Sequence, residues 1–120
     1  MKYLCLIYND ERQLSAMSEA DYRALADETL ALDEELRSSD YVVASDALEP
    51  VRAAVTVRVR DGRLSATDGP FAETKEQLGG FFLIEARDLN EAIQLAGRIP
   101  SARLGSVEVR PISEGGCRQP

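Results

Sequence analysis

Residues 80–86 read GFFLIEA, and residues 3–8 read YLCLIY. Both runs have the length of one β-strand, and neither alternates between apolar and polar residues. Both strands are therefore expected to be buried on two faces, as central strands of a sheet are. The fold must provide a layer against each of those faces.

Two helices are expected to supply one layer. Ser18 has the form of a helix N-cap, and the helix that it opens should run to about residue 38. Asp88 caps a second helix, which ends at Pro100. The periodicity predicts two buried stripes: Tyr22, Leu25, Thr29, Leu32 and Leu36 on the first helix, and Leu89, Ala92, Ile93, Ala96 and Ile99 on the second.

Further strands are expected at residues 41–44, 53–60, 63–67 and 106–112. Asp61-Gly62 is a preferred pair for a two-residue hairpin turn and joins two of them. The order is strand, helix, strand, hairpin, strand, helix, strand. It predicts an α+β fold, a ferredoxin-like βαβ-βαβ sheet with an inserted β-hairpin.

Two helices can cover only one face of such a sheet. The economical cover for the other face is a second copy of the chain, packed sheet to sheet, so we expect a homodimer. The expected domain spans residues 1–112, and residues 113–120, which lack periodicity, form a flexible tail.

The composition excludes several classes of function. The chain has 120 residues and a net charge of −7, which disfavours direct binding to nucleic acid. It contains no secretory signal and no membrane-length apolar run, so we expect a cytoplasmic protein that does not bind membranes. It has no His, and Cys5 and Cys117 are far apart in sequence, so neither a metal site nor another cofactor is expected. Catalysis by Ser-His-Asp or Cys-His groups is excluded as well.

Residues 67–82, TDGPFAETKEQLGGFF, form the most unusual stretch of the chain. Asp68 is a candidate general base or polar anchor, although Asp-Gly-Pro also forms turns without any chemistry. Phe71 either packs the turn against the core or forms an aromatic cleft wall. Glu73 and Lys75 are candidate ligand contacts, or simply solvated charges.

Glu108 and Arg110 are expected on one face of the last strand, opposite Val107 and Val109. If the valines face the helices, the charged pair faces the dimer cleft, where Arg58 of the hairpin could join it. An ion-pair network and a ligand site are both compatible with this placement.

The stretches MKYLCLIY, VRVRDGRLSATDGPFAETKEQLGGFFLIEA and RIPSARLGSVEVRPI together resemble the YCII-related proteins of the DGPF-domain group. The resemblance implies a dimeric α/β barrel, in which two ferredoxin-like sheets face each other around clefts. It also implies an association with sigma factors. Relatives use a His-Asp pair for lyase-type chemistry. This chain keeps the Asp as Asp68 but has Leu104 where many DGPF proteins have His.

Two functions are compatible with the sequence, so whether the protein is an enzyme stays open at this point. The first is a non-catalytic, homodimeric accessory protein, either regulatory or binding a small anionic or hydroxylated ligand. The alternative is a small-molecule lyase or isomerase that uses Asp68 with Glu108 or Tyr8. A lone carboxylate is a weak base at neutral pH, which favours the first. The candidate ligand-binding residues are Tyr8, Arg58, Asp68, Phe71, Glu73, Lys75, Glu108 and Arg110.

Overall fold

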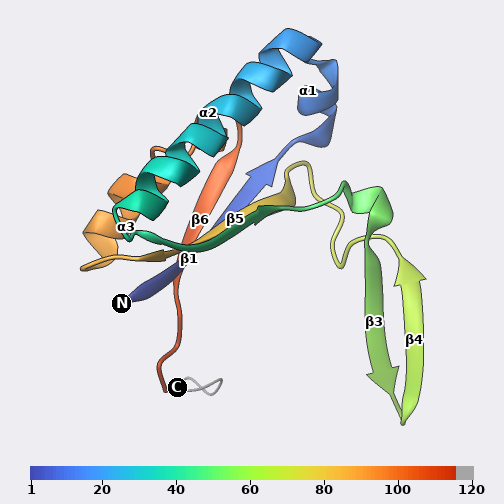
Figure 1. Ribbon diagram of the computed structural model, residues 1–120. Helices are drawn as coiled ribbons and strands as arrows, with labels where there is room; N and C mark the ends of the chain where they lie inside the picture. The colour runs from blue at the N-terminus through green and yellow to red at the C-terminus, as the bar shows by residue number, and fades with distance from the viewer. Residues whose placement is uncertain (116–120) are drawn as a thin grey trace.

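The computed structural model describes residues 1–115 (Figure 1). The strands and main helices come in the predicted order, and three short helices that the sequence pattern did not predict are added. The elements are β1 (Lys2–Asn9), α1 (Glu11–Ala16), α2 (Glu19–Ser38), β2 (Val42–Ala47), the 3₁₀ turn η1 (Val51–Ala53), β3 (Val55–Arg60), β4 (Arg63–Asp68), β5 (Gln77–Glu85), α3 (Leu89–Ala96), α4 (Ser101–Leu104) and β6 (Ser106–Pro111).

Four strands form one sheet in the order β2-β5-β1-β6, and every neighbouring pair is antiparallel. In the register, Cys5 of β1 lies between Phe82 of β5 and Val109 of β6. This order is that of a ferredoxin-like sheet and confirms the predicted fold class. β3 and β4 form a separate two-stranded hairpin (Figure 1).

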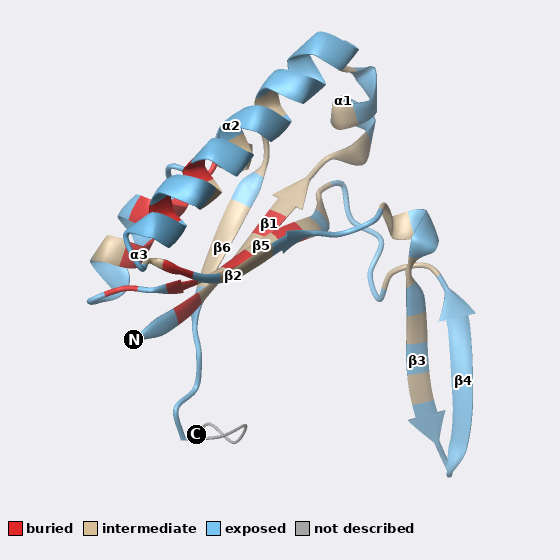
Figure 2. Ribbon diagram, viewed as in Figure 1, coloured by how far each residue is buried: buried red, intermediate tan, exposed pale blue. Residues whose placement is uncertain are grey.

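Helices α2 and α3 cover the same face of the sheet, and the core lies between them and the strands (Figure 2). From the two central strands it takes Tyr3, Cys5, Ile7, Phe82 and Ile84, and from the helices mainly Leu32, Leu36, Ala92, Leu95 and Ala96. Burial raises the pKa of the Cys5 thiol to about 11, so Cys5 is neutral core rather than a nucleophile.

The opposite face of the sheet has no cover from the described part of the chain. Because side chains alternate along a strand, Leu4 and Leu6 of β1 share this face with Phe81 and Leu83 of β5, their partners in the register. All four are half-buried. The prediction that β1 and β5 are apolar on both faces is therefore confirmed. We call this surface, with Tyr8, Glu108 and Arg110 on it, the open sheet face.

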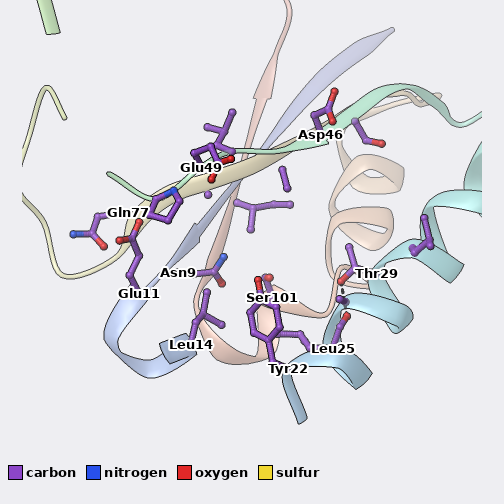
Figure 3. A pocket seen from close by; sticks show the side chains of 18 of the residues that line it. Asn9, Glu11, Leu14, Tyr22, Leu25, Thr29, Asp46, Glu49, Gln77 and Ser101 are labelled. Carbon is purple, nitrogen blue, oxygen red and sulfur yellow. Dashed lines mark hydrogen bonds between the residues drawn. The ribbon is translucent and has the colours of Figure 1, made fainter. Parts of the chain in front are cut away.

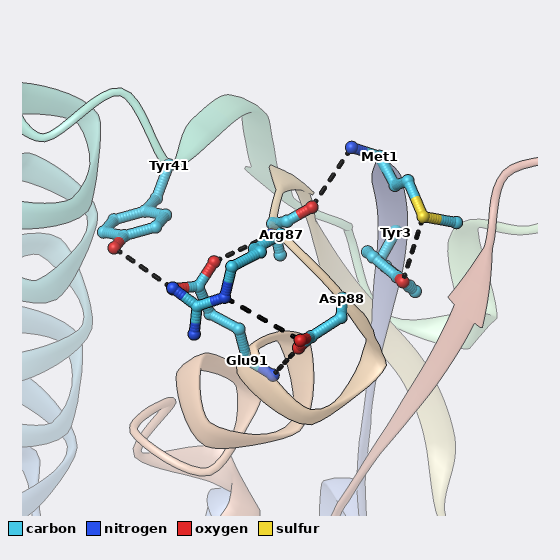
Figure 4. Close-up of polar contacts among 7 residues, drawn as sticks. Met1, Tyr3, Tyr41, Arg87, Asp88 and Glu91 are labelled. Atoms are coloured by element: carbon cyan, nitrogen blue, oxygen red, sulfur yellow. Dashed lines mark hydrogen bonds and ion pairs between the residues drawn. The ribbon is translucent and has the colours of Figure 1, made fainter.

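The helix ends follow local chemistry. The Ser18 hydroxyl accepts from the Asp21 N–H at 3.1 Å at the start of α2, as the cap pattern predicted. At the start of α3, the Asp88 carboxylate accepts from the Glu91 N–H at 2.8 Å (Figure 4). The Glu91 carboxylate accepts in turn from the Arg87 N–H at 2.8 Å and from the Tyr41 hydroxyl at 3.4 Å. This second contact ties α3 to the start of β2.

The predicted buried stripe of the second helix is wrong in part. Ala92, Ala96 and Ile99 are buried, but Leu89 is 48% and Ile93 49% exposed. Leu95 is buried instead, so the apolar stripe is rotated toward positions 92, 95 and 96. The helix also stops at Ala96, and the residues around Pro100 open α4.

An ion pair joins α4 to α2. Arg103 donates two hydrogen bonds to the Glu28 carboxylate, at 3.1 and 2.8 Å. These hydrogen bonds, with the charge of the guanidinium, lower the pKa of Glu28. Both side chains are exposed, so the pair orients α4 more than it stabilises the fold.

Two further predictions concern the C-terminal tail and the absence of membrane-spanning helices. Residues 113–115 contain no helix or strand, while the rest of the expected tail, with Cys117, lies outside the described residues. Among the helices of residues 1–115, none is long and apolar enough to cross a membrane.

Candidate functional site

The Asp68-Gly69-Pro70 turn follows β4 and leads into an irregular segment before β5. Gly69 has a φ of 111°, which side-chain-bearing residues rarely adopt. Its N–H donates to the Ala54 carbonyl oxygen at 2.7 Å, and its carbonyl oxygen accepts from the Thr56 hydroxyl at 2.8 Å. The Asp68 carboxylate is exposed and bonds to no described residue. The turn is thus held at Gly69, and Asp68 does not cap it.

Phe71 lies outside the core, because its side chain is 82% exposed. The interpretation that it packs the turn against the core is therefore wrong. Its ring lies under the Arg58 guanidinium instead, 5.8 Å from ring centroid to Cζ. This distance permits a cation–π contact. Glu73 and Lys75 follow in the same segment, both exposed and without contact to the other candidate residues.

Three candidate residues do meet on the open sheet face. Arg110 donates from Nε to the Glu108 carboxylate at 2.9 Å and from a terminal nitrogen to the same oxygen. The Tyr8 hydroxyl lies 3.5 Å from the other Glu108 oxygen. The register places Val107 and Val109 on the helix-covered face, as predicted. The charges of Glu108 and Arg110 neutralise each other, as is typical of a structural ion pair. The remaining N–H groups of the Arg110 guanidinium are free to bind an anion.

A groove lies on the other side of the sheet, beside the core. It has a volume of about 1040 Å³ and lies between the N-terminal part of α2 and the ends of β1, β2 and β5. Leu14, Tyr22 and Leu25 line the helix side, and Asn9 lies opposite them (Figure 3). The groove exists because only the C-terminal half of α2 packs on the sheet: Leu32 and Leu36 are buried, whereas Tyr22 is 53% exposed.

The groove is lined by charged and uncharged polar side chains in similar number, and most of its charged side chains are acidic. Asn9 Oδ1 is buried and accepts no hydrogen bond from the described residues. The hydroxyls of Tyr22 and Ser101 also bond to no residue that the structure describes, so they can serve a ligand. Glu11 is engaged, because one of its oxygens accepts from the Val51 N–H at 3.0 Å.

One end of the groove is closed by a hydrogen-bonded network between α2 and β2. The Ser45 hydroxyl donates to Asp33 at 2.5 Å and accepts from Arg37 at 3.0 Å. Arg37 also pairs with Asp33 at 3.2 Å. These three side chains satisfy one another, and they fix the spacing between the helix and the strand rather than offering free groups.

The comparisons with known proteins agree with the fold. The family model of the YCII-related domain matches residues 1–115. The chain belongs to the YCII-related family. A protein of Rhizobium meliloti (strain 1021), described as uncharacterized, is 38% identical over 115 residues, which cover 94% of this chain and 93% of the relative.

The predicted residues of this YCII-related protein do not converge on one site. Tyr8, Glu108 and Arg110 lie together, and Arg58 and Phe71 lie together on the hairpin side. The side chains of Asp68, Glu73 and Lys75 make no hydrogen bond or ion pair with either group. None of the eight lines the groove. Leu104 is half-buried at the end of α4. Within residues 1–115, no three acidic or Cys side chains gather as a metal site would require.

Sequence reasoning missed the groove residues of this YCII-related protein for a definable reason. Tyr22, Leu25 and Thr29 lie on the apolar face of α2, which the periodicity predicts to be core along its whole length. A 20-residue helix is about 30 Å long. The eight residues of β1 extend over about 26 Å. The helix is therefore longer than the strand. This difference in length was the one signal that the N-terminal part of α2 would extend beyond the sheet.

Proposed function

We propose that this YCII-related protein binds a small molecule without transforming it, and that the groove beside α2 is the binding site. The observation that carries the proposal is the groove itself. Its volume of about 1040 Å³ is at the upper end of the range for small-molecule sites, about 300–1,000 Å³. Apolar walls with a few unpaired polar groups are the usual lining of such sites.

The lining favours a hydroxylated ligand with an apolar body. Tyr22, Leu25 and Leu14 offer the apolar contacts, and Asn9 and Ser101 offer neutral hydrogen-bonding groups. A ligand donor that reaches Asn9 Oδ1 would satisfy a buried acceptor that otherwise costs free energy. An anionic ligand fits less well here. It would find a better partner in Arg110 on the open sheet face.

The protein is proposed to act as a homodimer through the open sheet face. Half-buried apolar side chains in the centre of that face, Leu4, Leu6, Phe81 and Leu83, support a partner surface of the same kind. Two sheets packed in this way would enclose Tyr8, Glu108 and Arg110, as the dimeric α/β barrel of the family implies. Association with a sigma factor and a cytoplasmic location stay predictions.

The lyase or isomerase alternative receives less support. It needs Asp68 beside Tyr8 or Glu108, but the Asp68 carboxylate is exposed at the base of the hairpin and makes no hydrogen bond or ion pair with the described residues. Only another molecule could bring these groups together. A catalytic role of Asp68 therefore stays a prediction.

A thermal-shift screen of small hydroxylated and anionic metabolites tests the binding proposal, because a ligand that binds the folded state raises its apparent stability. Hits are measured again with two matched variants, Tyr22→Ala in the groove and Phe71→Ala beside the Asp68 turn. Both remove an exposed aromatic ring, from side chains that are 53% and 82% exposed. The groove site predicts that Tyr22→Ala weakens binding by about tenfold or more and that Phe71→Ala does not.

The opposite pattern would move the site to the Asp68 turn and contradict the groove. If no compound in the screen stabilises the parent protein, the binding function itself is contradicted.

A further inference from the structure

The β3–β4 hairpin stands apart from the rest of the molecule. Within residues 1–115, its two strands make their extensive contacts only with each other, and the hairpin extends past the side of the sheet that lacks helices (Figure 1). The described chain is correspondingly open, with a radius of gyration of 16.2 Å. A compact chain of this length would have about 14 Å. We call residues 55–68 the arm.

One face of the arm is apolar and exposed. Val55, Val57 and Val59 alternate along β3 and are 55%, 58% and 58% exposed. The register places Ala66 opposite Val57 and Leu64, which is 72% exposed, opposite Val59. A two-stranded hairpin is marginally stable alone in water, and an apolar face of this kind marks a contact surface. The valine face therefore needs cover that residues 1–115 do not supply.

The other face of the arm is polar. Thr56 lies opposite Thr67, and Arg58 lies opposite Ser65. The polar face already has local cover, because Arg58 stacks on Phe71 and Thr56 bonds to Gly69. The two faces of the arm thus differ: the polar face has partners among the described residues, whereas the valine face has none there. A hairpin that served only as a solvated connection would not need such a difference.

Resting on the dimer proposed above, we propose that the valine face of the arm packs on a second copy of this chain. The open sheet face alone would give a small interface. Its four strands, at about 4.8 Å spacing and about 20 Å length, give a footprint of about 400 Å². A stable interface buries about 800 Å² of accessible surface on each partner, so a contact by the arm would enlarge a small interface. The arm projects on the same side as that face and can supply it.

Charge favours a copy of the same chain over an unrelated partner. Residues 55–68 hold three arginines and two aspartates, whereas the whole chain has a net charge of −7. The arm is therefore basic and the remainder of the chain strongly acidic. In a two-fold dimer each basic arm lies against the acidic body of the other copy, so the same electrostatic attraction forms at two symmetric places.

The test compares Val57→Asp with Ser65→Asp. Both add one carboxylate in the middle of the arm, the first on the valine face and the second on the polar face. Sedimentation equilibrium across protein concentrations gives the dimer dissociation constant of each variant and of the parent. We expect Val57→Asp to raise it by about tenfold or more, and Ser65→Asp to change it by less than about threefold.

Amide hydrogen exchange checks the arm directly. In the dimer, the Val57 and Val59 amides should exchange slowly, and dilution to monomer should release them. Fast exchange at all concentrations would overturn the proposal.

The outcomes distinguish a failure of the arm contact from a failure of the dimer proposal on which it rests. A dimeric parent whose dissociation constant responds equally to both substitutions, or to neither, contradicts the arm contact and leaves the open-face dimer intact. A parent that is monomeric at about 100 micromolar contradicts both. A melting curve for each variant shows whether the body stays folded, as expected when the arm contacts it so little.

Discussion

Gly105 shows how one residue without a side chain fixes the joint between α4 and β6. A Cβ at this position would collide with the Tyr8 carbonyl oxygen and approach the Asn9 Cα to 3.3 Å. Backbone atoms inside a sheet cannot move aside as a flexible side chain can. The sequence GSVEVRP therefore begins with glycine because β6 starts directly against β1.

We expect Gly105→Ala to lower the free energy of unfolding by about 3 kcal/mol, as overpacking against a fixed backbone does. Gly79→Ala is the matched control. Its Cβ would meet the Asn9 side-chain nitrogen at 3.3 Å, and that side chain can shift, so a change of less than about 1 kcal/mol is expected. Urea denaturation of the three proteins measures the difference. Equal losses in both variants would show that the close approach at Gly105 is not limiting.

At the scale of one element, α2 ends in an unusual way. Asp40 adopts a φ of 63°, a conformation that glycine adopts with less strain. The Asp40 N–H donates to the Arg37 carbonyl oxygen at 3.1 Å, and the Tyr41 N–H donates to that of Leu36 at 2.8 Å. This pair of bonds is the Schellman motif, here with aspartate in place of the usual glycine.

Asp40→Gly should therefore raise the free energy of unfolding by about 0.5–1 kcal/mol, because the strain at positive φ is removed while both bonds remain. Ser39→Gly, one residue earlier at a φ of −95°, should lower it by a similar amount, because glycine there only adds freedom to the unfolded chain. Chemical denaturation gives both values. A loss at position 40 would mean that the Asp40 side chain itself stabilises the helix end.

The elements differ in how far the sequence could predict them, and the reason is physical. β1 and β5 were predictable because unbroken apolar runs report burial on both faces, and the hairpin because Asp61-Gly62 occupies two positive-φ positions, 53° and 74°. α1 was missed because its six residues contain no buried position and thus no apolar stripe. Its signal was only the Asp10 cap, which accepts from the Arg12 N–H.

The candidate site was harder to predict than the fold because it depends on contacts between distant segments. Glu108 and Arg110 could be placed on one face from alternation alone, and the structure has them there. The groove arises where α2 leaves the sheet, and Asn9 and Ser101 reach it from segments about ninety residues apart. No local pattern records that divergence, whereas the unusual composition around Asp68 is visible in the sequence.

The whole molecule is flat, with extents of 47 × 42 × 20 Å, since the helices form a single layer on the sheet and the arm adds length without thickness. A single layer of helices leaves the other face of the central strands exposed to solvent. Burying apolar area stabilises by about 25 cal/mol per Å². Covering the open sheet face on two copies therefore offers a large driving force for association.

The parent protein is expected to sediment at about twice its chain mass of 13.2 kDa at micromolar concentration. Leu6→Lys should bring it to the monomer mass, because Leu6 lies in the middle of the open sheet face, between Phe81 and Glu108. Burying an ammonium there is costly, since Arg110 already neutralises the Glu108 carboxylate. Ile93→Lys is the matched control. Ile93 is 49% exposed on α3, on the helix-covered side, so this variant should remain dimeric. A monomeric parent, or a Leu6→Lys protein as dimeric as Ile93→Lys, would rule out association through this face.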